Sequence, residues 1–93
     1  MPAHVYMMAS KKNGTLYIGV TANLKDRVFK HKERVHEGFT KKYDVTNLVW
    51  AEEFFDVRDA ITREKQIKKW NREWKIKLIA ANNPEWEDLY ETL

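Results

Sequence analysis

Five side chains of this sequence could together carry out acid–base and phosphate chemistry. They are two phenols, an arginine and a histidine four residues apart, and a carboxylate on an apolar stripe: Tyr6, Tyr17, Arg27, His31 and Glu64. An arginine fork matches phosphate oxygens and can stabilise charge that develops on a scissile phosphate. Two phenols could orient water or assist proton transfer, but a phenol of pKa about 10 needs a cation or metal to act as a base near neutral pH.

Glu64 is the hardest of the five to explain by structure alone. It lies between Ile61 and Ile67 on a stripe predicted to face the core, where an unsatisfied charge costs stability. One interpretation is an ion pair with Lys68, one helical turn on, at the edge of the core. The other is a ligand for a hard divalent cation, because one carboxylate with waters and phosphate oxygens can hold Mg²⁺.

The other candidates also have ordinary structural explanations. Arg27 and His31 could be a surface arginine beside a histidine that packs by its ring, and Tyr6 and Tyr17 are favoured strand residues. The three histidines lack the spacing of a zinc site, and the sequence contains no glycine-rich phosphate loop and no convincing serine or threonine triad.

The elements that must position these residues begin with a hairpin. Residues 5–9 and 16–20 are predicted to form two strands around a turn at residues 11–14. Alternation places Tyr6 and Tyr17 on the face opposite the aliphatic residues. A four-residue loop would set the two phenols directly across from one another, and a two-residue loop would keep them on one face but further apart. In either case we expect the phenols on an open sheet face.

A helix should follow the hairpin, because apolar residues recur there every three or four positions. Thr21 or Asn23 can cap its start, and Gly38 can end it. On this helix Arg27 lies four residues before His31, so the two side chains meet on one flank.

A third strand, over about residues 48–55, and two more helices complete the domain. Asp56 caps the first of these helices, and the second covers residues 73–81. The apolar face of the Asp56 helix consists of Val57, Ala60, Ile61, Ile67 and Trp70. The order strand, strand, helix, strand, helix, helix predicts an α+β fold, in which a small three-stranded antiparallel sheet is flanked by three helices.

Length and composition indicate a single domain over residues 1–93. The chain has no cysteine, which excludes disulfides, thiol catalysis and cysteine zinc sites. The longest apolar run, residues 5–9, is too short to span a bilayer, and the N-terminus lacks the features of a signal peptide. We therefore expect a cytoplasmic protein with no membrane partner.

Positive charge is concentrated in two segments. Residues 22–42 hold seven Lys or Arg against three acids, residues 63–77 hold seven against two, and residues 84–93 hold four acids and no base. Basic helix faces are often ordinary solvated surface, but two of them in one small domain favour a nucleic-acid partner. The candidate DNA contacts are Lys25, Lys30, Lys41, Lys42, Lys65, Lys68 and Arg72.

Residues 68–75 interleave basic and aromatic side chains, which could form a stacking platform for unpaired bases. Trp70 and Trp74 are four residues apart, a spacing that more often anchors a helix in the core. We favour packing for both.

Taken together, these residues resemble the GIY-YIG endonuclease family. The first motif is matched at residues 4–6, where His4 replaces the glycine of the family name, and the second is matched at residues 17–19. The match continues through Thr21, Arg27, His31 and Glu64. The segments 63–70 and 83–86 are similar to small stand-alone bacterial members, which in turn resemble the amino-terminal domain of the excision-repair nuclease.

The resemblance implies metal-dependent hydrolysis of DNA phosphodiester bonds, in DNA repair or recombination, with one Mg²⁺ or Mn²⁺ ion. Tyr6 or Tyr17 would help to activate water, Arg27 would stabilise the phosphate and Glu64 would hold the metal. Val20 stands where some repair-type members have a lysine, so one cation that could lower the pKa of a tyrosine is missing.

Two other functions compete with nuclease activity. One is a nucleic-acid-binding module of the same fold with little or no catalysis, and the other is an adaptor whose basic faces bind acidic proteins. One active site per chain would need a homodimer, or two visits, to cut both strands. The lack of a separate DNA-recognition domain favours weak specificity or a recruiting protein partner.

Overall fold

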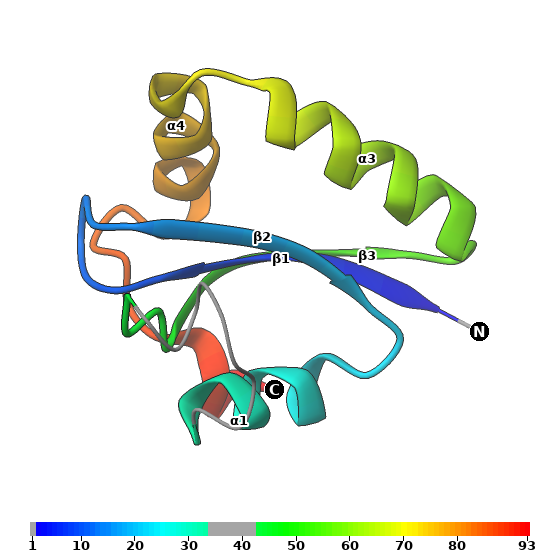
Figure 1. Ribbon diagram of the computed structural model, residues 1–93, viewed down its shortest axis with the longest axis horizontal. Coiled ribbons are helices and arrows are strands. Elements are labelled where there is room, and N and C mark those ends of the chain that lie inside the picture. The colour runs from blue at the N-terminus through cyan, green and yellow to red at the C-terminus, as the bar shows by residue number, and fades with distance from the viewer. Residues whose placement is uncertain (1, 34–42) are drawn as a thin grey trace.

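The computed structural model describes residues 2–33 and 43–93 and has an α+β fold, with helices on both sides of one antiparallel sheet (Figure 1). The elements are the strands β1 (Ala3–Ala9), β2 (Leu16–Thr21) and β3 (Asn47–Phe54), and the helices α1 (Leu24–Lys32), α3 (Val57–Lys69) and α4 (Arg72–Asn82). A short 3₁₀ helix, η1 (Leu89–Thr92), follows in the acidic segment, where no element is predicted. The predicted fold class, sheet and order of the longer elements are confirmed.

The register of the hairpin differs from both predicted loops. β1 is the central strand, so β2 and β3 are edge strands. Residues 10–15 connect β1 to β2, and the register places Tyr6 opposite Gly19 and Tyr17 opposite Met8. The two phenols therefore lie diagonally on one face of the sheet, closer than a two-residue loop would allow but not directly across from one another.

Both faces of the sheet are buried, each against its own helices. The cluster beneath α3 and α4 includes Val5, Met7, Ile18, Ile67 and Ile79. The cluster on the α1 side includes Tyr6, Met8, Leu24, Val28 and Leu48. The prediction of an open sheet face around the phenols is wrong, because α1 covers that face and Tyr6 is fully buried.

The helix boundaries follow from their capping residues. The side chain of Asn23, and not that of Thr21, caps α1 by accepting a hydrogen bond from the third backbone amide beyond it. The helix ends at Lys32, and Gly38, which is predicted to end it, lies outside the described residues. Asp56 caps α3 as predicted.

α3 buries a narrower stripe than the sequence suggests. Ala60 and Ile67, about two turns apart, are fully buried, whereas Val57 and Ile61 are exposed. The assignment of the last two to the apolar core face is therefore wrong. Glu64 lies on the same stripe as Ala60 and Ile67, and the chain thus carries a carboxylate along its line of contact with the sheet.

α4 extends one residue beyond its predicted range at each end and is anchored by Ile79, which is fully buried. Trp70, at the end of α3, packs against the core as predicted. The packing expected for Trp74 is wrong, because this side chain is exposed. No helix within the two described ranges is both long and apolar enough to cross a membrane.

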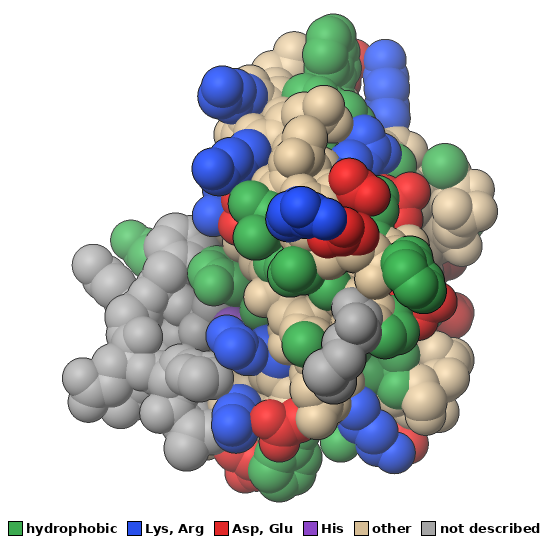
Figure 2. All heavy atoms as spheres, turned by 90° about the vertical axis from the view of Figure 1, so that its right-hand side faces the viewer, with side chains coloured by type: hydrophobic (Ala, Val, Ile, Leu, Met, Phe, Trp, Pro, Cys, Tyr) green, Lys and Arg blue, Asp and Glu red, His purple; other side chains and the backbone are tan. Residues whose placement is uncertain are grey.

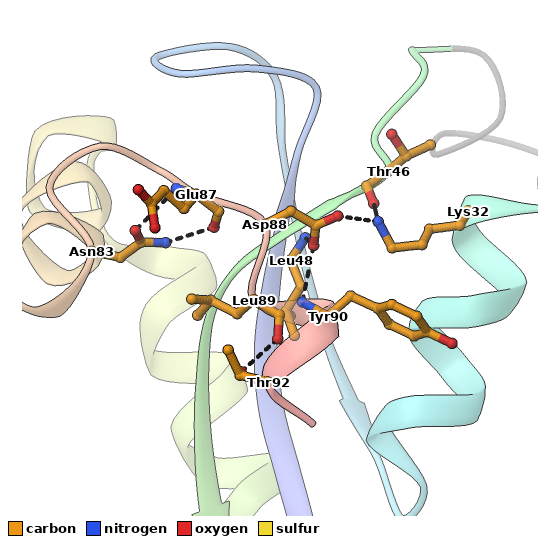
Figure 3. Close-up of polar contacts among 9 residues, drawn as sticks. All are labelled: Lys32, Thr46, Leu48, Asn83, Glu87, Asp88, Leu89, Tyr90 and Thr92. Atoms are coloured by element: carbon orange, nitrogen blue, oxygen red, sulfur yellow. Dashed lines mark hydrogen bonds and ion pairs between the residues drawn. The ribbon is translucent and has the colours of Figure 1, made fainter.

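The acidic C-terminal segment is tied to the sheet and to α1 through Asp88 (Figure 3). Its carboxylate accepts hydrogen bonds from the backbone amides of Leu48 and Tyr90, both at 3.1 Å, and pairs with the ammonium group of Lys32. Lys32 also donates to the carbonyl oxygen of Thr46 at 3.1 Å. These contacts hold η1 against the face of the sheet that contains Tyr6.

Candidate active site

Three aromatic side chains from three different elements meet on the α1 side of the sheet. The ring centroids of Tyr6 and Tyr17 are 6.2 Å apart, and the ring of His31 lies 5.8 Å from the first and 5.3 Å from the second. The hydroxyl oxygen of Tyr6 and Nε2 of His31 form a hydrogen bond of 3.1 Å. β1, β2 and α1 thus bring together residues separated by up to 25 positions in the sequence.

Gly19 is required by the position of the Tyr6 ring. A Cβ atom at residue 19 would lie 2.7 Å from the hydroxyl oxygen of Tyr6 and 2.8–2.9 Å from two of its ring carbons. These distances are shorter than any van der Waals contact between the atoms, so a larger residue would push the phenol away. The glycine of the second motif therefore makes room for the tyrosine of the first.

Tyr6 is held in its neutral form. Burial raises its pKa strongly, and the neighbouring Tyr17 adds to this effect, while the guanidinium group of Arg27 acts in the opposite direction without overcoming it. The guanidinium group of Arg27 is close enough to Tyr6 to act on its pKa, which places it beside the aromatic cluster. Four of the five predicted site residues, Tyr6, Tyr17, Arg27 and His31, are thus brought together.

An open groove borders the outer edge of the sheet at Tyr17. This groove, which we call the Tyr17 groove, has a volume of about 270 Å³ and is lined by Leu16, Tyr17, Ile18, Lys68 and Lys75. It joins the edge strand β2 to α3 and α4, which lie on the opposite side of the sheet from α1 (Figure 1). The ring of Tyr17 lies on the α1 side with Tyr6 and His31, so the groove and the aromatic cluster are on opposite sides of β2. Tyr17 is half-buried, whereas Tyr6 is enclosed.

Glu64 makes the ion pair that its spacing predicts. Its carboxylate lies 3.2 Å from the ammonium group of Lys68; the Glu64 side chain is 17% exposed and that of Lys68 is 54% exposed. Glu64 belongs to α3, on the other side of the sheet from α1, and its partner Lys68 lines the Tyr17 groove. The structure does not place Glu64 in contact with the aromatic cluster.

Glu64 is the one predicted site residue whose side chain suits a hard divalent cation. Within residues 2–33 and 43–93 there is no group of three His, Asp or Glu side chains that could hold a metal ion. Glu64 offers a single, largely buried carboxylate, and Mg²⁺ is commonly bound by one or two carboxylates while it keeps several waters and contacts substrate phosphates. The side chain thus fits such an ion if the pair with Lys68 opens.

The six lysines among the predicted DNA contacts fall into three groups. Lys25 and Lys65 are exposed, and Lys30 is exposed but paired with Asp26 at 3.1 Å. Lys68 lines the Tyr17 groove. Lys41 and Lys42 lie outside the described residues.

Arg72 has a contact that the sequence did not suggest. Its guanidinium group donates to the carbonyl oxygens of Asn13 and Gly14, at 2.7 Å and 2.6 Å, and ties the start of α4 to the loop of the hairpin. Lys75, by contrast, is not among the predicted contacts but lines the Tyr17 groove. Its only signal in the sequence is membership of the basic segment 63–77, because the groove is formed by β2 and α4 together.

The described residues of one face form no continuous basic surface. Figure 2 shows basic, acidic and hydrophobic side chains interspersed there. Acidic partners of basic side chains include Asp56, whose carboxylate binds the guanidinium of Arg58, and Glu52, which pairs with Arg63 at 3.1 Å. The Tyr17 groove, which is lined by two lysines, is the better candidate for binding a phosphate backbone.

Known proteins are similar to this chain in sequence and in fold. A UPF0213 protein of Staphylococcus saprophyticus is 32% identical over 80 residues, which cover 86% of this chain and 98% of the relative. A UPF0213 protein of Clostridium perfringens is 34% identical over 88 residues, covering 95% of this chain and 92% of the relative. The solution NMR structure of a UPF0213 protein from Bacillus halodurans is 25% identical, with a TM-score of 0.59, and the match covers 95% of this chain and 93% of that chain.

The sequence also matches the GIY-YIG catalytic domain over residues 2–77. This range contains the aromatic cluster, Arg27, the Tyr17 groove and Glu64. The match spans most of the chain and every residue of the candidate site, and on this evidence the chain belongs to the GIY-YIG family of nuclease domains.

Proposed function

We propose that this protein is a metal-dependent DNA endonuclease that hydrolyses phosphodiester bonds beside Tyr17, at the β2 edge of the sheet. The observation that carries the proposal is the meeting of Tyr6, Tyr17, His31 and Arg27 on the α1 side of that edge, with a groove lined by two lysines on its other side. A role in DNA repair or recombination is part of the proposal and rests on resemblance to the excision-repair nuclease. DNA is the proposed partner because the chain carries a net charge of +3 and places lysines in the groove.

We assign different roles to the two phenols from their exposure. Tyr17 is half-buried on the edge strand β2 and acts on the attacking water, whereas Tyr6 is buried and neutral and, through its hydrogen bond to His31, holds the aromatic cluster in place. His31 contacts both rings and fixes their relative orientation. Arg27, whose charge acts on the pKa of Tyr6, supplies positive charge beside the phenols in place of the lysine missing at Val20. Lys68 and Lys75 line the groove on the other side of β2 and supply positive charge for the DNA backbone there.

Arg27 and Glu64 act on the phosphate. Arg27 stabilises negative charge on the phosphate oxygens as the water oxygen bonds to phosphorus and the bond to the leaving oxygen breaks. The leaving oxygen takes a proton, so the products are a phosphomonoester and a free hydroxyl. Glu64 is the residue that would hold Mg²⁺ or Mn²⁺, which would neutralise charge on the scissile phosphate.

The test is cleavage of supercoiled, branched and single-stranded DNA, with Mg²⁺ or with a chelator. Arg27→Ala should lower the rate about a hundredfold while leaving most DNA binding intact, because a contact made mainly in the transition state is worth about 3 kcal/mol. Arg58→Ala is the matched control, since Arg58 is an exposed arginine whose guanidinium binds Asp56 and not the site. Near-normal rates for Arg27→Ala would remove Arg27 from the mechanism.

Tyr17→Phe and Tyr6→Phe test the division of roles in the same assay. Tyr17→Phe should slow cleavage while the protein stays folded, whereas Tyr6→Phe should lower stability because it removes the buried hydrogen bond between the Tyr6 hydroxyl and Nε2 of His31. If Tyr6→Phe alone slows cleavage and Tyr17→Phe does not, the enclosed phenol acts on the water and the assignment is wrong. If neither variant slows cleavage, both tyrosines serve only to pack the sheet.

A protein that binds nucleic acid with little or no catalysis is the second candidate. The observation that favours it is the ion pair between Glu64 and Lys68, which competes with metal for the same carboxylate. Salt-sensitive DNA binding without cleavage, under any of the metal conditions, would support it. For duplex DNA a plot of log affinity against log salt concentration should have a slope of about −0.9 for each phosphate that the protein neutralises.

A further inference from the structure

α4 carries an aromatic groove that the proposed catalytic site does not use. Trp70, Trp74, Lys77 and Leu78 line an open groove of about 330 Å³, which we call the tryptophan groove. The two indole rings meet edge to face, with centroids 5.9 Å apart. The groove therefore combines a fixed aromatic surface with a cation.

Trp74 differs from the other three tryptophans in its burial. Trp50 and Trp86 belong to the core, and Trp70 packs against the same core with the guanidinium group of Arg63 over its ring at 5.2 Å. Trp74 is 54% exposed, although it is one turn from Trp70 and could be replaced by a polar residue without uncovering the core. Exposed aromatic surface beside charged groups is typical of binding sites and not of packing.

The positions of the neighbouring lysines indicate a nucleic-acid ligand. Lys75 follows Trp74 directly on α4 and lines the Tyr17 groove, so α4 contributes to both grooves with adjacent residues. Lys77 pairs with Glu73 at 3.5 Å, but both side chains are at least 70% exposed, and such a pair is weak enough to yield to a phosphate. Cations that follow a backbone together with an aromatic ring for stacking are the features by which proteins bind unpaired nucleotides.

We propose that Trp74 stacks an unpaired base of a DNA strand whose phosphates contact Lys77 and Lys75, and that this gives the protein a preference for DNA with unpaired nucleotides. The inference rests on the proposed function, because the strand that occupies the tryptophan groove is the one that continues into the Tyr17 groove. A paired base is stacked inside the duplex and cannot present its face to Trp74, so duplex DNA gains only the charge of the lysines and nothing from stacking.

The experiment measures binding by fluorescence anisotropy at fixed salt, with a single strand and a duplex of the same length. Trp74→Ala should weaken binding of the single strand by between about 5-fold and about 150-fold and binding of the duplex by less than about twofold. Trp74→Phe, which keeps a stacking ring, is the matched variant and should retain most of the affinity. Lys77→Gln should weaken binding of both DNAs and reduce the salt dependence of each.

A single strand that carries a run of abasic sites separates stacking from charge. On this strand the wild type and Trp74→Ala should bind equally, because there is no base to stack. If Trp74→Ala weakens the single strand and duplex alike, or weakens the abasic strand as much as the normal one, the stacking site does not exist. If the wild type binds no DNA at all, the proposed function fails as well. If the wild type binds and cuts duplex DNA, and Trp74→Ala binds the single strand as tightly as the wild type does, only this inference is overturned.

Discussion

Replacing Gly19 by alanine tests whether the tyrosine of the first motif and the glycine of the second form one packing unit. The backbone of Gly19 does not adopt a left-handed conformation, so alanine is compatible with its backbone. An alanine Cβ would nevertheless lie 2.7 Å from the hydroxyl oxygen of Tyr6. Tyr6 cannot easily move, because it is fully buried and hydrogen-bonded to His31.

Two opposing effects set the magnitude. Glycine inside a strand costs about 0.5–1 kcal/mol relative to alanine, so Gly19→Ala alone would stabilise β2 by that amount. Overpacking of a buried ring costs about 1–3 kcal/mol, which reverses the sign of the change. For a domain of this size each kcal/mol corresponds to about 4–8 °C in Tm. We therefore expect Gly19→Ala to melt several degrees below the wild type.

The assay is thermal unfolding of Gly19→Ala in two backgrounds, the wild type and Tyr6→Leu. Tyr6→Leu removes the ring that faces Gly19 while keeping an apolar side chain in the core, so in that background the same alanine should cost nothing or should stabilise the protein. A Tm for Gly19→Ala equal to or above that of the wild type would refute the packing unit. An equal loss in both backgrounds would mean that the strain arises elsewhere on β2.

Three further perturbations follow from single contacts. Glu64→Gln removes the ion pair with Lys68, which is worth about 0.3–0.5 kcal/mol on a helix. The Tm without metal should therefore change little, while Mg²⁺-dependent cleavage is lost. A destabilised variant that still cuts DNA would remove Glu64 from the metal site. Asp88→Ala leaves the Leu48 amide without its acceptor and should lower the free energy of unfolding in urea by about 1–3 kcal/mol. Asp88→Asn keeps an oxygen acceptor and should cost less. Equal losses for the two variants would mean that the hydrogen bond to Leu48 is not the cause. Burial raises the pKa of Tyr6 and favours its neutral form in the folded protein, so this group should not change stability below about pH 10, and stability should fall as the pH rises above that value. Tyr6→Phe should reduce this fall. If the free energy of unfolding falls equally steeply with pH in both proteins, burial of Tyr6 is not the cause.

Local patterns in the sequence are sufficient to predict which elements form and which residues are available for chemistry. Alternation and helical periodicity depend on neighbouring residues, so the strands, the Asp56 cap and the fold class follow from local patterns. The spacing of Arg27 and His31 on one helix likewise follows from helix geometry alone. The pair of Glu64 with Lys68 is local in the same sense, because the two residues are one helical turn apart.

How those residues meet depends on tertiary packing. The register of the hairpin depends on a loop of residues 10–15, whose length could not be chosen from its sequence, and it places Tyr6 over Gly19. The face that contains Tyr6 is buried because α1 packs on it, and this contact encloses the Tyr6 phenol while Tyr17, on the edge strand β2, stays half-buried. The two grooves and the exposure of Trp74 arise where α4 lies beside β2 and α3. Such contacts join residues far apart in the chain, and their geometry depends on how whole elements pack, which no local pattern contains.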